Sequence, residues 1–205
     1  PHNLDKLRPI GIGTVWRRLA SSVIALSYAD TFAEYLLPEG QFGLTIRGGL
    51  DFLVHSANCQ HDTSITHPLA NGLPPNRAGI FVDLTNCWNQ MSREAALATL
   101  ESEPRFQALV HYFDLMYQQP NHCFFHRPDG SLDHFIQEDG FPQGEPLSPA
   151  LACLVIHQIL RPVKEMLRSR AHACRTNHHL GDDGCGSKSA AYAYFDDTYS
   201  FLPYD

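Results

Sequence analysis

Two apolar runs that each end in aspartate constrain the fold of this 205-residue chain more than any other feature. The first run starts at Gly79 and ends at Asp83, and the second starts at Ala191 and ends at Asp196 and Asp197. Short runs rich in β-branched and aromatic residues predict strands. If the two strands are neighbours in one sheet, their carboxylates lie together at one edge of that sheet.

Carboxylates held this close need a cation between them. Hard oxygen ligands suit Mg²⁺, which keeps several waters and also binds substrate phosphates. Such a group is typical of two-metal phosphoryl transfer, in which the ions lie about 3.5–4 Å apart. The alternative is that the aspartates are ordinary turn residues on the surface. The residues alone leave both interpretations open.

The composition excludes several classes of protein. The hydrophobic fraction of 43% is that of a globular domain. The formal net charge of −7 argues against a protein that coats nucleic acid by bulk charge. No run approaches 18 apolar residues, so we expect no membrane span. The six cysteines are scattered and form no Cys-x-x-Cys pair, which favours free thiols in a reducing, intracellular compartment.

Helical and strand patterns alternate along the chain, which predicts an α/β or α+β class. We expect helices over residues 15–37, 48–58, 92–101, 105–118 and 148–170, with Thr14 and Ser148 as caps. Hairpins are predicted over 123–136, around a Pro-Asp-Gly turn, and over 191–202. Residues 59–77 and 171–189 are polar and read as loops.

Five motifs in a fixed order resemble those of one polymerase family. They are Arg8-Pro9-Ile10-Gly11-Ile12 with Arg17-Arg18, Gln41-Phe42-Gly43-Leu44 with Arg47-Gly48-Gly49, Phe81 to Asn89 with Arg93 (motif A), Gly140 to Pro149 (motif B) and Tyr194-Phe195-Asp196-Asp197 (motif C). Together they resemble the reverse transcriptases of group II introns and non-LTR retrotransposons. The resemblance covers nearly the whole chain, and motif B is its most specific part.

The resemblance implies an α+β right-hand polymerase with fingers and palm. The palm would be a small antiparallel sheet backed by helices. Residues 1–78 would form the fingers subregion and residues 79–205 the palm subregion. We expect the thumb to be absent, because the chain stops shortly after motif C.

The resemblance also implies the catalytic residues. Asp83 and Asp196 would bind two Mg²⁺ ions, with Asp197 as the second, more peripheral carboxylate of motif C. One ion would lower the pKa of the primer 3′-hydroxyl, and the other would bind the triphosphate and its leaving group. Arg8 and Arg18 match positions near the incoming triphosphate, where a guanidinium binds phosphate oxygens. A solvated basic face is the alternative for both arginines.

Three further positions would bind the nucleotide. Trp88 stands where the family places an aromatic steric gate, usually Phe or Tyr, that blocks the ribose 2′-hydroxyl; packing in the core is its alternative role. Gln143 and Gly144 would contact the templating base pair and let the backbone approach the nucleotide. Glu145 replaces a commoner Asp.

The implied activity is RNA-directed DNA polymerisation in a retroelement, with an RNA template, a DNA primer and dNTPs as partners. The alternative is a truncated, inactive retroelement fragment that only binds nucleic acid or a partner. A plain interaction module would leave the spaced motifs unexplained. One dense group of zinc-type ligands remains, at His172, Cys174, His178, His179 and Cys185, but its spacing matches no common zinc pattern, so we expect a surface loop there.

Overall fold

The structure is a computed structural model that describes residues 10–44, 47–73, 77–84, 86–177, 190–194 and 197–203. The chain divides into two compact units, each built from two separate stretches. The first unit comprises Pro1–Thr31 and Thr85–Val155, and the second comprises Phe32–Leu84 and Ile156–Asp205. Two of the three divisions fall inside helices, α2 (Ala29–Leu36) and α8 (Ser148–Asn177), and the third lies between Leu84 and Thr85.

The described elements follow one another along the chain in the following order. They are α1 (Val15–Ser27), α2 (Ala29–Leu36), a 3₁₀ turn (Leu37–Glu39), α3 (Gly49–His61), a π-helical turn (Asp62–Thr66), α4 (His67–Ala70), β1 (Arg77–Val82), α5 (Cys87–Gln90), α6 (Arg93–Ser102), a 3₁₀ turn (Pro104–Phe106), α7 (Gln107–Tyr117), β2 (Asn121–His126), β3 (Leu132–Gln137), α8 (Ser148–Asn177), β4 (Ala190–Tyr194) and β5 (Asp197–Pro203).

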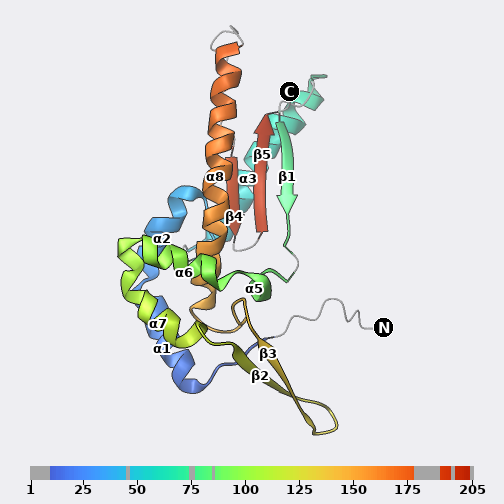
Figure 1. Ribbon diagram of the computed structural model, residues 1–205. Helices are drawn as coiled ribbons and strands as arrows, with labels where there is room; N and C mark the ends of the chain where they lie inside the picture. The colour runs from blue at the N-terminus through green and yellow to red at the C-terminus, as the bar shows by residue number, and fades with distance from the viewer. Residues whose placement is uncertain are drawn as a thin grey trace. The chain divides into compact units, whose positions relative to one another are not determined.

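The first unit combines short helices with the β2–β3 hairpin. Its core is aromatic: Phe113, Tyr117 and Phe141 are buried, and the ring centroids of Tyr117 and Phe141 lie 5.5 Å apart, edge to face. Asn121 pairs with Gln137 at the base of the antiparallel hairpin. The tip of the hairpin points away from the helices of this unit (Figure 1).

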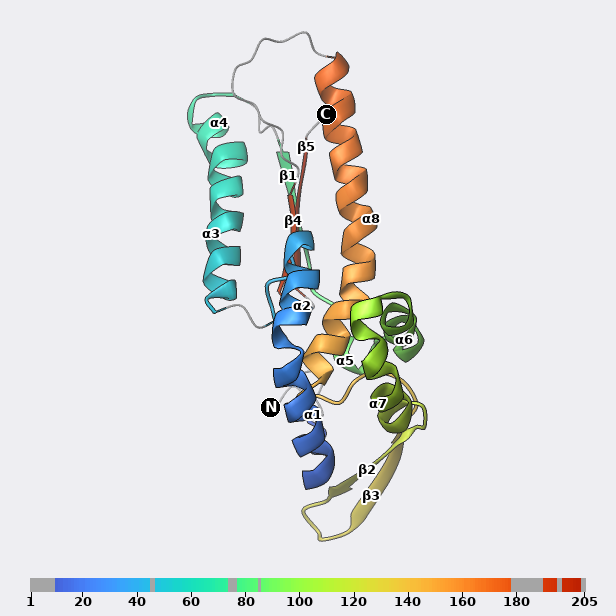
Figure 2. The same cartoon turned by 90° about the vertical axis from the view of Figure 1, so that its left-hand side faces the viewer.

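The second unit is built on a three-stranded antiparallel sheet with the order β1-β5-β4. Figure 2 shows this sheet between α3 and the C-terminal part of α8. Ala191 and Ala193 of β4 are fully buried, and so is Leu53 on α3. Helix α3 contacts β4. Small side chains on the strand allow helix and sheet to approach closely.

The sequence pattern predicts the strands well. Both hairpins are confirmed, and the strand before Asp83 is confirmed as β1. Thr14 caps α1, because its Oγ1 accepts a hydrogen bond from the Arg17 amide at 3.4 Å. The α+β class is confirmed as a mixture of helices with small antiparallel sheets.

Two predicted helices and one predicted loop have the wrong extent. The expected helix over 15–37 is two helices, separated at Tyr28. The expected loop over 59–77 is helical as far as Ala70, because α3 continues into the π-helical turn and α4. Helix α8 extends to Asn177, past the predicted end at Arg170. The polar composition after residue 58 and after residue 170 predicts the end of a helix, but in both places the helical structure continues.

Neither compact unit is a continuous stretch of chain. The subdivision into fingers (1–78) and palm (79–205) therefore differs from the division by contacts, and it stays a prediction. None of the helices in the described part of the chain is both long and apolar enough to cross a membrane.

Candidate functional site

The first candidate feature is one end of the three-stranded sheet in the second unit. Strand β1 pairs with β5 so that Val82 lies opposite Thr198. Asp83 follows Val82 and Asp197 precedes Thr198, so the antiparallel register brings both aspartates to the same end of the sheet. Asp83 is exposed. The strand adjacency on which the carboxylate hypothesis depends is therefore present.

Motif C occupies the turn between β4 and β5. Tyr194 ends β4 and pairs with Asp197, the first residue of β5. Asp196 stands between these two paired residues in the sequence, and it lies outside the described residues. The proximity of Asp83 and Asp196 therefore stays a prediction.

The second expected motif, Gln41 to Leu44, lies beside the strand that leads to motif C. Gln41 forms a parallel bridge with Ala193. The Phe42 amide donates to the Ala193 carbonyl at 2.8 Å, and the Ala193 amide donates to the Gly40 carbonyl at 2.8 Å. The Gln41 side chain is fully buried, and its Oε1 accepts from the Gly43 amide at 3.0 Å. This segment thus extends the sheet beyond β4.

Trp88 belongs to the first unit, on the short helix α5. Asn86 begins this helix in the left-handed region, at φ 53°, which Asn tolerates better than most residues. The Asn86 side chain accepts a hydrogen bond from Asn89 Nδ2 at 2.7 Å. Trp88 is half-buried, and its carbonyl accepts from the Phe141 amide at 2.7 Å. Motif A and motif B are therefore joined by their backbones.

Gln143 and Gly144 lie against the segment that contains the first motif. Ile10 forms a parallel bridge with Gln143, and the Gly11 amide donates to the Gln143 carbonyl at 2.8 Å. Gly144 has φ +105°, and a Cβ there would lie 3.1 Å from the Gly11 carbonyl oxygen. Glycine is needed here because the two backbones pass so closely.

The two arginines predicted to bind phosphate have different outcomes. Arg8 lies outside the described residues. Arg18 is exposed on α1, which is compatible with either of its two predicted roles. Neither role is tested by the structure.

A buried polar cluster around Glu145 has no counterpart among the sequence predictions. Glu145 is 3% exposed, and Arg17 donates to it through Nε at 3.0 Å and Nη2 at 3.1 Å. Ser21 Oγ donates to Glu145 Oε1 at 2.7 Å, and Tyr117 Oη donates to Oε2 at 2.5 Å. Ser21 Oγ also shares a hydrogen bond of 2.5 Å with the Tyr112 hydroxyl. A buried charge is tolerated only when it is paired and hydrogen-bonded in this way.

Charge and burial shift the pKa values in this cluster. Burial alone would lower the pKa of Arg17, but the hydrogen bond and negative charge of Glu145 outweigh it, so that pKa is raised. Burial, together with the neighbouring Glu145, raises the pKa of Tyr117 well above its ordinary value. The Arg17 guanidinium also lies 5.1 Å from the Tyr117 ring centroid. The pair is thus an ion pair with a neutral tyrosine beside it.

Arg93, which accompanies motif A in the sequence, is a second arginine buried in this unit. Its guanidinium donates to the backbone carbonyls of Gly140 (2.9 Å), Tyr117 (3.1 Å), Gln119 (3.2 Å) and Gln137 (3.4 Å). Its burial lowers its pKa. One side chain thus connects the ends of α7 and β3 with the start of motif B.

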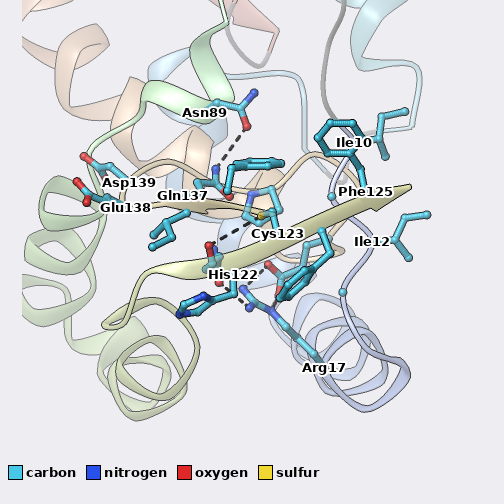
Figure 3. Close-up of a pocket in the computed structure, with 18 of the residues that line it drawn as sticks. Ile10, Ile12, Arg17, Asn89, His122, Cys123, Phe125, Gln137, Glu138 and Asp139 are labelled. Atoms are coloured by element: carbon cyan, nitrogen blue, oxygen red, sulfur yellow. Dashed lines mark hydrogen bonds and ion pairs between the residues drawn. The ribbon is translucent and has the colours of Figure 1, made fainter. Parts of the chain in front are cut away.

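A cavity of about 1000 Å³ lies beside motif B within the first unit. Figure 3 shows Arg17, Asn89, His122, Cys123 and Gln137 among the residues that line it. Its walls are the segment 10–14, the β2–β3 hairpin and the start of motif B.

The described residues hold no group of three or more His, Cys, Asp or Glu side chains that could bind a metal ion. Asp196 and residues 178–185 of the His/Cys segment lie outside that description, so neither metal hypothesis is tested by it. Among the described residues, Cys59, Cys87, Cys123 and Cys153 form no disulfide.

The fold resembles solved telomerase structures. Telomerase from Candida tropicalis in complex with a TWJ fragment of telomeric RNA matches with a TM-score of 0.55 and 10% identity, over 92% of this chain and 29% of the other. Apo telomerase from the same organism matches with a TM-score of 0.52 and 10% identity, over 90% and 30%. The Candida albicans enzyme with the TWJ fragment matches with a TM-score of 0.50 and 11% identity, over 93% and 30%.

This chain shares its fold with these telomerases and spans about 30% of their chains. Residues 2–203 match the family model described as reverse transcriptase (RNA-dependent DNA polymerase). The chain therefore belongs to the reverse transcriptase family. No curated protein sequence matches it.

Proposed function

We propose that this chain is the RNA-directed DNA polymerase domain of a retroelement, which adds deoxynucleotides to a primer 3′-hydroxyl. The observation that carries the proposal is the register of β1 with β5, because it brings Asp83 and motif C to one end of a sheet. Family membership of residues 2–203 supports the reaction class.

The carboxylates at this sheet end fit Mg²⁺, because carboxylate oxygens are the ligands that the ion prefers. Asp83 and Asp196 would bind two ions, and Asp197 would add a more distant negative charge. Bound Mg²⁺ supplies a lowered pKa at the primer hydroxyl and charge neutralisation at the triphosphate. The protein's own task is to hold Asp83 and motif C at the ends of paired strands.

Residues of the first unit would select the nucleotide. Arg8 and Arg18 would bind triphosphate oxygens, and Trp88 would exclude the ribose 2′-hydroxyl. Gln143 and Gly144 would contact the templating base pair. The backbone bonds of Gln143 to Gly11, and of Trp88 to Phe141, support these roles, since they give both positions a defined backbone.

The proposed partners are an RNA template, a DNA primer and dNTPs. Two of the similar telomerase structures are complexes with a fragment of telomeric RNA. That likeness, together with the family's RNA-dependent activity, supports RNA as the template here.

Primer extension on a poly-rA template with Mg²⁺ tests the proposal. The full-length polypeptide that carries these residues is compared with its Asp196→Ala variant. We expect extension by the parent and a loss of at least about 100-fold in the variant, since one carboxylate ligand is removed. If the parent extends no primer, or if the variant extends equally well, the chain is a nucleic-acid- or partner-binding relative without polymerase activity.

The gate role of Trp88 has a separate test. We expect Trp88→Ala to raise ribonucleotide incorporation relative to deoxynucleotide incorporation by about tenfold or more, because about 1.4 kcal/mol of lost discrimination has that effect. The ratio of kcat/KM values for rNTP and dNTP measures this. Trp16→Ala is the matched control, because Trp16 is 79% exposed on α1. An unchanged sugar preference in Trp88→Ala would refute the gate.

A further inference from the structure

Glu145 has a position within motif B that the polymerase chemistry does not use. Its carboxylate is buried, and its charge is paired with the Arg17 guanidinium. A buried carboxylate needs strong donors to offset the cost of removing its charge from water. The donors therefore indicate what Glu145 holds in place.

The donors of Glu145 come from two helices of the first unit. Arg17 and Ser21 lie one turn apart on α1, and Tyr117 ends α7. Arg17 also donates through Nη1 to Asn121 Oδ1, at the start of β2, at 2.9 Å. Glu145 and its partner Arg17 thus attach the loop between β3 and α8 to α1, α7 and β2.

The restraint reaches Gln143 and Gly144 through the backbone. The Glu145 amide donates to the Pro142 carbonyl at 3.3 Å, which closes a tight turn over these two residues. On the other side of the turn, the Gly11 amide donates to the Gln143 carbonyl at 2.8 Å. Gly11 and Arg17 belong to the same stretch of chain, so the Arg17–Glu145 pair and the Gly11–Gln143 bond hold the same two segments together at two points.

The length of the glutamate side chain matters for this arrangement. The carboxylate of an aspartate at position 145 would lie about 1.5 Å farther from these donors, because the side chain is shorter by one carbon–carbon bond. Bonds of 2.5–3.1 Å from Arg17, Ser21 and Tyr117 could not all persist at that displacement. The commoner aspartate of this motif would thus not replace Glu145 in this chain.

We propose that Glu145 is a positioning residue, which holds Gln143 and Gly144 against segment 10–12 and thereby sets nucleotide affinity. The effect on affinity rests on the proposed polymerase function, whereas the effect on the loop does not. Loss of the carboxylate loosens the turn, so that Gln143 is no longer presented in one conformation. The chemical step at the aspartates is affected less.

Two measurements on the full chain separate these effects. Hydrogen exchange of the Gly11 amide reports the loop, and steady-state primer extension reports KM and kcat for dNTP. In Glu145→Gln we expect Gly11 exchange to rise at least tenfold and KM to rise at least fivefold, with kcat changed less than twofold. Glu101→Gln, an exposed position on α6 in the same unit, should change neither.

Each outcome decides one part of the proposal. Unchanged Gly11 exchange in a folded Glu145→Gln variant overturns the positioning role. Raised exchange with unchanged KM overturns the link to affinity. A rise in KM that is matched by an equal fall in kcat indicates a merely structural role. A parent that extends no primer defeats the proposed function alone, because exchange still reports the loop. If Glu145→Gln does not fold, Glu145→Asp keeps the charge and should raise exchange in the same direction.

Discussion

Arg93 connects several elements of the first unit through a single side chain. Its guanidinium is buried and donates to four backbone carbonyls, and its own amide donates to Asp139 Oδ1 at 2.8 Å. Carbonyls at the ends of helices and strands lack partners in their own element. Arg93 supplies those partners, which a shorter cation cannot do at four positions at once.

We therefore predict that Arg93→Ala lowers the free energy of unfolding by about 3 kcal/mol, because buried carbonyls lose their donor. Urea denaturation followed by circular dichroism measures this. Arg161→Ala is the matched control, since Arg161 forms an exposed ion pair with Glu165 and should cost less than about 0.5 kcal/mol. Equal effects of the two variants would contradict the role of Arg93.

At the scale of elements, motif B is a loop whose path depends on close backbone packing. Gly140 has φ +76°, and a Cβ there would overlap the backbone of Asn89. Its amide donates to the Met91 carbonyl at 3.0 Å, so the loop cannot move away without losing that bond. The glycine lets motif B contact the residues that follow motif A's short helix.

We predict that Gly140→Ala destabilises the chain by at least about 3 kcal/mol, through backbone strain and overlap with Asn89. Gly130, in the turn of the β2–β3 hairpin, provides the control. It has φ +84°, but no atom lies within 4 Å of the point that a Cβ would occupy, so Gly130→Ala should cost only the strain, about 1 kcal/mol. Similar losses in both variants, measured by urea denaturation, would mean that the overlap is relieved.

The sequence predicts these elements unevenly, for physical reasons. Strands and hairpins have a local signal, since apolar runs and turn residues such as Pro128-Asp129-Gly130 belong to neighbouring positions. Asp62, Thr63, Ser64 and Thr66 have side chains that favour turns by local hydrogen bonding, yet residues 59–70 continue α3 as helix. Tertiary contacts outweigh propensity there.

The candidate site is predictable only where local strand patterns place its residues. Asp83 and motif C lie at one sheet end, as the strand pattern suggests. The Arg17–Glu145 pair joins residues 128 positions apart, and no local pattern relates them. The only sequence signal is the replacement of aspartate by glutamate at position 145, which has no interpretation until its donors are located.

At the scale of the whole molecule, the proposed ion site links metal binding to stability. A ligand that binds only the folded chain stabilises it by RT ln(1 + [L]/Kd), which is about 1.4 kcal/mol at ten times Kd. We predict that saturating Mg²⁺ raises the melting temperature by about 3–6 °C relative to EDTA. The shift should fall below about 1 °C in Asp83→Asn, because a carboxylate ligand is lost.

Differential scanning fluorimetry with and without Mg²⁺ measures this shift without any need for activity. Asp129→Asn, which changes an exposed aspartate in the β2–β3 turn, should keep the full response. A response to Mg²⁺ of the same size in Asp83→Asn would place the ion elsewhere.

The order β1-β5-β4 also has a consequence for synthesis. Strand β1 leaves the ribosome well before its partner β5, which ends at Pro203. At 5–20 residues per second, about 6–24 s pass before the two can pair. During that interval Ile80, Phe81 and Val82 present an unpaired apolar strand edge, which is a template for aggregation. The nascent chain should therefore depend on chaperones until β5 emerges.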